Sequence, residues 1–201
     1  MKKETLQKRT KIANDIMYYI YTHIETNIDI EELSIDLGIS KFHMHRIFKE
    51  AFGKNIYESI KSIRLQKASN LLLTNKYSTI SNIVNQCGYS SQSSFIKIFK
   101  DRFEMTPKEW KNGGYKEYSQ KILQQSQRAS QSKADFKDIV PTIVKMPAIE
   151  SYYIRNKGYN INIKETWQKL QTWILTNDII SYKRIALFHD NPTITPLNEC
   201  Q

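Results

Sequence analysis

Apolar side chains recur every three or four residues through the first half of the chain, and this spacing predicts a series of amphipathic helices. Two of these helices are near copies, in residues 40–53 (SKFHMHRIFKEAFG) and residues 91–104 (SQSSFIKIFKDRFE), and each copy begins with a serine that can cap a helix. Their apolar stripes consist of Met44, Ile47, Phe48 and Phe52 in the first copy and Phe95, Ile98, Phe99 and Phe103 in the second. We expect both stripes to face a core.

The duplication extends to the residues that precede each copy. The matching positions are Ile30, Leu33 and Gly38 in the first repeat and Ile80, Ile83 and Gly88 in the second. A short helix, a glycine turn and a second helix with a polar outer face form the outline of a helix-turn-helix, whose second helix enters the major groove of DNA. The sequence therefore predicts two helix-turn-helix units in one chain.

A single long helix is predicted between the two units. Residues 56–74 contain no Gly or Pro and keep a helical apolar pattern. At 1.5 Å per residue this helix would span about 28 Å, while successive major-groove faces lie about 34 Å apart along one side of B-DNA. A rigid connector of this length would let one monomer place both recognition helices in adjacent turns. Alternatively, the helix only packs the two halves into one core, and the two interpretations are compatible.

The outer faces of the duplicated helices carry candidate DNA-binding side chains. They are Lys41, His45, Arg46 and Lys49 in the first helix and Gln92, Ser93, Lys97 and Lys100 in the second. Side chains of these types can reach phosphates and base edges. Arg46 is the best candidate for base readout, because its planar guanidinium can donate two hydrogen bonds to guanine N7 and O6. A phosphate contact or a solvated charge is the alternative for Arg46.

The pattern changes after the second repeat. Residues 113–139 are rich in Gln, Ser and Lys, which is typical of a linker. In residues 140–201 the pattern predicts strands at 141–145, 149–155 and 184–189, and an amphipathic helix from Ile163 to about Asn177. The predicted fold class is a mainly α domain in residues 8–112, followed by the linker and a small α+β segment.

The charge of the chain is consistent with a nucleic-acid partner. The net charge is +10, and more than half of the excess falls in residues 1–113, as expected for a surface that meets phosphates. Many soluble basic proteins bind nothing charged, so the charge alone decides little. No apolar run approaches about 18 residues, and the charged N-terminal residues lack the apolar segment of a secretory signal. We therefore expect a cytoplasmic protein without a membrane span.

The sequence shows no arrangement of residues that is typical of catalysis. We find no catalytic constellation, no phosphate-binding loop and no redox pair of cysteines. His43 and His45 are two residues apart and cannot share one helix face, which argues against a zinc site. We therefore expect a protein that is not an enzyme and that needs no cofactor or metal.

With these residues identified, residues 1–112 resemble the DNA-binding domain of the AraC/XylS family of transcription regulators, and they are most similar to its Rob, MarA and SoxS branch. The resemblance is carried by Ile63, Arg64, Leu65, Ala68, Leu71 and Leu72 in the connector and by Gly88, Tyr89, Phe95, Phe99, Lys100, Thr106 and Pro107 in the second unit. It implies a regulator that binds double-stranded DNA sequence-specifically, reads an asymmetric site as a monomer, and acts as an activator with RNA polymerase as a partner.

The resemblance also implies which positions meet DNA. The base-reading positions are Phe42, His45 and Arg46 in the first recognition helix and Gln92, Ser93 and Lys97 in the second. Independently of the resemblance, we expect contacts to the DNA backbone from Ser40, Lys41, Lys49, Ser91 and Lys100, and the alternative for the lysines is plain surface charge. Members of this branch usually carry Trp, Gln and Arg at the positions of Phe42, His45 and Lys97, so their target DNA sequence does not transfer to this chain.

Residues 140–201 resemble about the first half of a GyrI-like effector-binding domain, which surrounds a small-molecule pocket. The resemblance is carried by Met146, Pro147, Ala148, Gly158, Tyr159, Trp167 and the run FHDNPTITP in residues 188–196. Tyr152, Tyr159, Trp167 and Trp173 are candidate residues of a pocket for a lipophilic cation, and the alternative for each is ordinary core packing. The chain could instead be mainly a small-molecule sensor. A half domain could also lack the pocket, which leaves an effector-independent regulator or a dimer of two half-domains.

Overall fold

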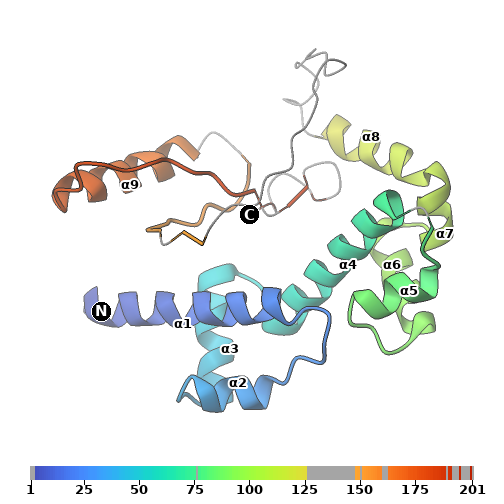
Figure 1. The fold of residues 1–201 in the computed structure, drawn as a ribbon, viewed down its shortest axis with the longest axis horizontal. Coiled ribbons are helices and arrows are strands. Elements are labelled where there is room, and N and C mark those ends of the chain that lie inside the picture. Colours follow the sequence, from blue (N-terminus) through green and yellow to red (C-terminus); the bar gives the residue numbers. More distant parts are fainter. Residues whose placement is uncertain are drawn as a thin grey trace. The chain divides into compact units, whose positions relative to one another are not determined.

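The structure, a computed structural model, describes residues 3–75, 77–125, 148–149, 151–159, 163–188, 190–191, 195 and 200. The chain divides into two compact units, Met1–Tyr115 and Lys116–Gln201, and we describe each by itself. The helices of the described residues (Figure 1) are α1 (Lys3–Thr22), α2 (Ile30–Asp36), α3 (Lys41–Phe52), α4 (Ile56–Thr74), α5 (Ile80–Gln86), α6 (Gln92–Phe103), α7 (Pro107–Glu109), the π-helix η1 (Trp110–Gly114), α8 (Tyr115–Gln125) and α9 (Ile163–Thr176).

The first helix-turn-helix consists of α2 and α3, and α1 packs against α3. The core of this part contains Ala13, Ile16, Met17, Ile20, Ile24, Ile30, Leu33, Met44, Ile47, Phe48, Phe52, Ile56 and Ile60. The apolar stripe predicted for residues 40–53 is therefore confirmed. Burying such a set of aliphatic and aromatic side chains supplies the main driving force for folding.

Local signals in the sequence set the ends of α2 and α3. The Asp29 side chain accepts hydrogen bonds from the first free amides of α2, and the Ser40 hydroxyl accepts from the backbone N–H of His43 at 3.3 Å in α3. Gly38 and Gly53 have φ angles of 61° and 71°, a left-handed conformation that glycine adopts without strain. The turn between the two helices and the end of α3 therefore lie where the sequence predicts them.

The long helix α4 has the predicted bounds, Ile56–Thr74. It begins with a capping box, in which the Asn55 side chain accepts from the backbone N–H of Glu58 at 2.8 Å and the Glu58 carboxylate accepts from the backbone N–H of Asn55 at 3.0 Å. Figure 1 shows α4 leading from the first helix-turn-helix to the second. The connector predicted from the sequence is thus a single helix.

The second helix-turn-helix, α5 and α6, repeats the architecture of the first. Thr79 and Ser91 cap its helices, and the buried stripe of α6 consists of Phe95, Phe99 and Phe103. Ile98, the fourth residue predicted for this stripe, is half-buried. Trp110 completes the aromatic core and donates from its indole nitrogen to the Ser69 carbonyl oxygen of α4 at 3.1 Å. This buried hydrogen bond attaches the second unit to the connector.

Arg64 of α4 contacts the segment between α1 and α2 on one side and the turn of the second helix-turn-helix on the other. Its guanidinium donates from Nε to the Ile24 carbonyl oxygen at 3.1 Å and from Nη2 to the Thr26 carbonyl oxygen at 2.6 Å, and both carbonyls lie in the segment that leaves α1. On the other side, its Cζ atom lies 5.8 Å from the ring centroid of Tyr89, which follows α5. Burial lowers the pKa of Arg64. The segment between α1 and α2 is therefore joined to the second helix-turn-helix through the Arg64 side chain as well as through the α4 backbone.

In the compact unit Lys116–Gln201, the helix predicted from Ile163 is confirmed as α9, but the predicted strands are not confirmed. Residues 151–155 and 184–188 have no regular secondary structure, and the strand predicted at 141–145 lies outside the described residues. A strand needs a hydrogen-bonded partner, and none of the described residues lies in a β-ladder. For residues 151–155 and 184–188, the alternation of apolar residues therefore did not correspond to a strand. The predicted linker, residues 113–139, begins with the end of η1 and with α8.

Candidate nucleic-acid interface

The outer face of α3 is formed by Phe42, Arg46 and Lys49, which are all exposed. This spacing of three or four residues places them on one side of the helix, opposite the buried stripe. Phe42 is 78% exposed. A large aromatic side chain with so much exposed surface on a polar helix face contributes little to the core, so it is available to a partner.

The outer face of α6 is built in the same way. Ser93, Lys97 and Lys100 are exposed and occupy the positions that match Phe42, Arg46 and Lys49. Gln92, at the first position of α6, is also exposed. The structure therefore leaves all these predicted DNA-binding side chains accessible, whereas contact with DNA itself stays a prediction.

Arg46 is held by neighbours within its own helix. Its Nη2 atom donates to Nδ1 of His43 at 3.2 Å, and its Nε atom lies 4.0 Å from the carboxylate of Glu50. The same carboxylate accepts from Arg9 of α1 at 2.8 Å. Exposed ion pairs of this kind contribute at most about 1 kcal/mol. The contacts therefore orient the guanidinium without preventing it from exchanging Glu50 for a base or phosphate.

Lys41 is paired with the neighbouring helix. Its ammonium donates to the Glu31 carboxylate of α2 at 2.8 Å. This hydrogen bond and the charge of Glu31 raise the pKa of Lys41. A DNA phosphate at this position would compete with Glu31, so Lys41 is less available than Lys49 or Lys100.

His45 is half-buried at the edge of the outer face of α3. Its ring centroid lies 5.6 Å from that of Tyr57, with an angle of 31° between the ring planes. Tyr57 is the second residue of α4 and is 58% exposed. The imidazole is therefore held from another helix, unlike the other predicted base-reading side chains.

The two recognition helices begin at serines that were predicted to contact the DNA backbone. The Ser40 hydroxyl accepts from His43 N–H, and the Ser91 hydroxyl accepts from Ser94 N–H at 3.4 Å. Each hydroxyl keeps its own hydrogen for donation to an acceptor. The free amides and the dipole at a helix N-terminus also favour a nearby anion. Both sites are exposed and can accept a phosphate.

Three side chains at this interface were not predicted from the sequence as functional residues. His43 and Glu50 lie three residues before and four residues after Arg46, so helical spacing could have identified them. Tyr57 lies on a different helix, and the only available signal was an aromatic residue at the exposed start of the predicted connector. Its contact with His45 depends on tertiary structure.

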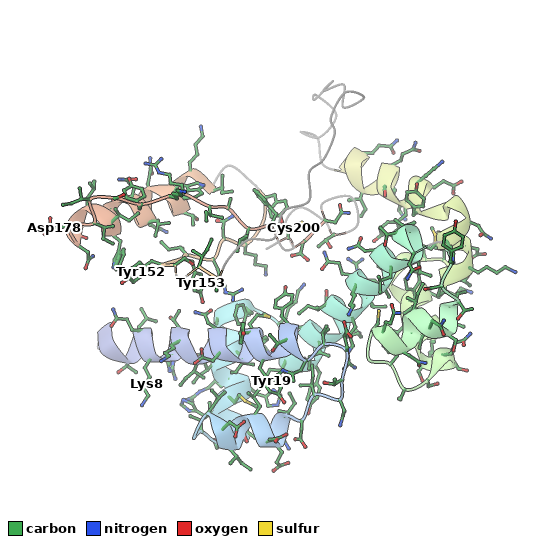
Figure 2. The ribbon with its side chains drawn as sticks, in the orientation of Figure 1. Lys8, Tyr19, Tyr152, Tyr153, Asp178 and Cys200 are labelled. Carbon is green, nitrogen blue, oxygen red and sulfur yellow. The ribbon has the colours of Figure 1, made fainter. Side chains whose placement is uncertain are left out.

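The four predicted pocket residues do not line one cavity among the described residues. Tyr152, which is labelled in Figure 2, packs on Trp173 with ring centroids 4.6 Å apart, whereas Tyr159 packs on Phe188 at 5.2 Å. Trp167 lines a separate hollow of about 200 Å³ beside α9. The hydroxyl of Tyr159 donates to the Asp190 carbonyl oxygen at 3.0 Å. An effector site in residues 140–201 therefore stays a prediction of the sequence.

None of the helices in the described part of the chain is both long enough and apolar enough to span a membrane.

Comparison with known proteins gives several matches to the compact unit Met1–Tyr115, which contains both helix-turn-helix repeats. A family model described as a helix-turn-helix domain matches residues 33–113. The chain is 34% identical over 105 residues to the probable transcription factor PqrA of Proteus vulgaris, a match that covers 51% of the chain and 85% of PqrA. It is 34% identical over 96 residues to the xylose operon regulatory protein of Escherichia coli strain K12, and here the match covers 48% of the chain but only 24% of that protein. A similar solved structure is the C-terminal domain of AraT, a response regulator from Geobacillus stearothermophilus, with 25% identity, a TM-score of 0.48, and coverage of 50% of the chain and 84% of that domain.

Proposed function

Since the chain belongs to the AraC-type family of helix-turn-helix transcription regulators, we propose that it binds double-stranded DNA sequence-specifically and inserts α3 and α6 into adjacent major-groove segments. The observation that carries this proposal is the pair of matching, exposed outer faces on α3 and α6. Each face is presented by a helix whose opposite side is buried, so the two helices cannot rotate to hide them.

The connector supports binding by a single protein molecule. The 19 residues of α4 span about 28 Å at 1.5 Å per residue, close to the roughly 34 Å between major-groove faces. Arg64 of α4 binds the segment that leaves α1 and packs on Tyr89 of the second helix-turn-helix. Trp110 donates a hydrogen bond to the Ser69 carbonyl oxygen of α4. A monomer with this construction reads an asymmetric site, because its two recognition helices carry different side chains.

We assign the base-reading roles by chemistry. Arg46 donates two hydrogen bonds to a guanine, Gln92 pairs with an adenine, and Phe42 packs on a thymine methyl group. His45, Ser93 and Lys97 read further base edges. The phosphate contacts come from Ser40, Lys41, Lys49, Ser91 and Lys100, and they position the helices without reading sequence.

We further propose that the DNA-bound protein activates transcription by contact with RNA polymerase. Support for this step comes from the family and from relatives named as a transcription factor and an operon regulator. Transcription in vitro from a promoter that carries the selected site, with and without the protein, tests it. A fall in transcript would indicate a repressor.

Selection from a random duplex library followed by footprinting tests the DNA-binding proposal. We expect an enriched asymmetric motif and two protected segments about one helical turn apart, roughly 10 base pairs. Lys49→Ala and Lys100→Ala should each reduce the slope of log affinity against log salt by about 1, since each removes a phosphate contact. Lys8→Ala, which removes an equally exposed charge from α1, should leave the slope unchanged. Absence of any enriched motif, or protection confined to half a turn, would contradict the proposal.

A further inference from the structure

We infer that Tyr57 is a specificity-determining residue that acts by positioning His45 for base readout. The inference rests on the proposed function, because it assigns a role within the DNA interface. It concerns a residue of the connector helix α4, outside both recognition helices.

The side chain of Tyr57 lies mostly outside the core. Its side chain is 58% exposed, while Ile56 beside it is fully buried. Its described ring contact is the one to His45, at 5.6 Å between centroids and 31° between planes. A largely exposed tyrosine whose ring contacts a half-buried histidine of the recognition helix can orient that histidine while contributing little to the core.

Backbone and capping hydrogen bonds fix the chain on either side of Tyr57. The capping box of Asn55 and Glu58 fixes the first turn of α4. Gly53, which ends α3, donates its N–H to the Lys49 carbonyl oxygen at 2.8 Å. The phenol ring is therefore presented to α3 from a defined position. A contact that is pre-organised in this way restricts the rotamers of His45 before DNA binds, which reduces the entropy lost on binding.

Tyr57 contacts His45 on the edge of α3 that also carries Lys41. Lys41 and His45 are four apart and share one edge of the helix. Lys41 is held on this edge by its hydrogen bond to Glu31 of α2 at 2.8 Å, and His45 is contacted by Tyr57 of α4. Each of the two residues on this edge is therefore engaged from a neighbouring helix.

The second unit provides an internal comparison. Its capping box, Thr106 with Glu109, matches Asn55 with Glu58, so Lys108 matches Tyr57 and Ile96 matches His45. Lys108 is exposed and Ile96 is half-buried. The aromatic pair is thus a property of the first unit alone among these matched positions. We therefore expect a side chain outside the recognition helix to influence base preference in the half-site read by α3 and not in the half-site read by α6.

The test measures base preference at every position of the selected site for the wild type and for Tyr57→Phe, Tyr57→Ala, His45→Ala and the double variant Tyr57→Ala/His45→Ala. Tyr57→Phe keeps the ring and should behave as the wild type. Tyr57→Ala should lose about three- to tenfold of the discrimination at the base positions that His45→Ala affects, as expected from the strength of an aromatic pair. The double variant should match His45→Ala, because Tyr57 acts through His45. Lys108→Ala, the matched control, should leave preferences in the α3 half-site unchanged.

Three results would overturn the inference. One is a Tyr57→Ala profile identical to that of the wild type, and another is a loss at positions that His45→Ala does not affect. The third is an equal loss of affinity for all sequences in both Tyr57→Phe and Tyr57→Ala, which would make the uncharged Tyr57 hydroxyl a phosphate contact that leaves the salt dependence unchanged. A wild type without any base preference would instead refute the proposed function. Circular dichroism of each variant separates these results from a failure to fold.

Discussion

The carbonyl oxygen of Ile24 lies 2.6 Å from the position that a Cβ atom on Gly88 would occupy. Ile24 belongs to the segment that leaves α1, and Gly88 is the turn glycine of the second helix-turn-helix. The Nη2 atom of Arg64 lies 2.8 Å from the same position. The segment that leaves α1 and the turn of the second helix-turn-helix therefore approach each other so closely that only glycine fits at position 88. This contact, together with α4, sets the relative position of the two recognition helices before DNA binds.

We expect Gly88→Ala to destabilise the protein much more than Gly38→Ala. The two glycines occupy matching turns and have φ angles of 71° and 61°, so both substitutions introduce the left-handed strain of about 1–2 kcal/mol. No atom lies within 4 Å of a Cβ on Gly38, whereas a Cβ on Gly88 would overlap backbone. Overpacking should add about 1–3 kcal/mol for Gly88→Ala alone. Urea denaturation of both variants measures the difference, and equal losses would show that the close approach is relieved cheaply.

The comparison of Gly38 with Gly88 also shows what the sequence could predict. The repeat identified both turns, because a left-handed residue is a local requirement. It could not show that one turn is crowded, since Ile24 and Arg64 reach Gly88 from distant positions in the chain. In the same way, the capped ends of α3 and α4 were predictable from Ser40 and Asn55, whereas the strands expected after residue 140 depended on partners that a local pattern does not identify.

The candidate interface also has some features that the sequence predicted and others that it did not. Helical periodicity predicted that Arg46 and Lys49 lie on an exposed face, because buried and exposed arcs alternate with the helix period. Phe42, an apolar residue, was identified only through the family resemblance. Helical periodicity did not predict that Lys41 is paired with Glu31 or that Tyr57 packs on His45. Both of these contacts join side chains from different helices.

We expect Arg46→Lys to lose base discrimination while retaining most of the non-specific affinity. A lysine keeps the positive charge but cannot donate the planar pair of hydrogen bonds, which is worth about 1–3 kcal/mol against the wrong base. Arg46→Ala should lose the same discrimination and, in addition, some affinity for every sequence. Binding of each variant to the selected site and to a single-base variant of it, at two salt concentrations, checks this expectation. Equal discrimination by wild type and Arg46→Lys would place Arg46 on a phosphate.

We expect the thiol of Cys87 to react slowly in the folded protein. Cys87 is 0% exposed, and burial raises its pKa to about 11. The thiolate is the reactive form, so both its low population at pH 8 and the lack of access oppose alkylation. Native labelling with iodoacetamide should be at least about 100-fold slower than labelling in denaturant, by the fraction of thiolate alone. Peptide mapping distinguishes Cys87 from Cys200, and rapid labelling of Cys87 at pH 8 would contradict its burial in the folded state.

The capping box at α7 should make part of the stability depend on pH. Glu109 accepts hydrogen bonds from the backbone N–H of Thr106 at 2.7 Å and from its hydroxyl at 2.8 Å, and these bonds lower the pKa of the carboxyl group. A folded pKa below the unfolded value means that the carboxylate stabilises the fold above the unfolded pKa, about 4.3. This contribution is lost as the pH falls through the folded pKa. Glu109→Gln removes the charge and keeps the shape, so its melting temperature should lie below that of the wild type at pH 7, and the gap should narrow between pH 5 and pH 3. A gap that stays constant over this range would show that the charge of Glu109 does not contribute through the cap.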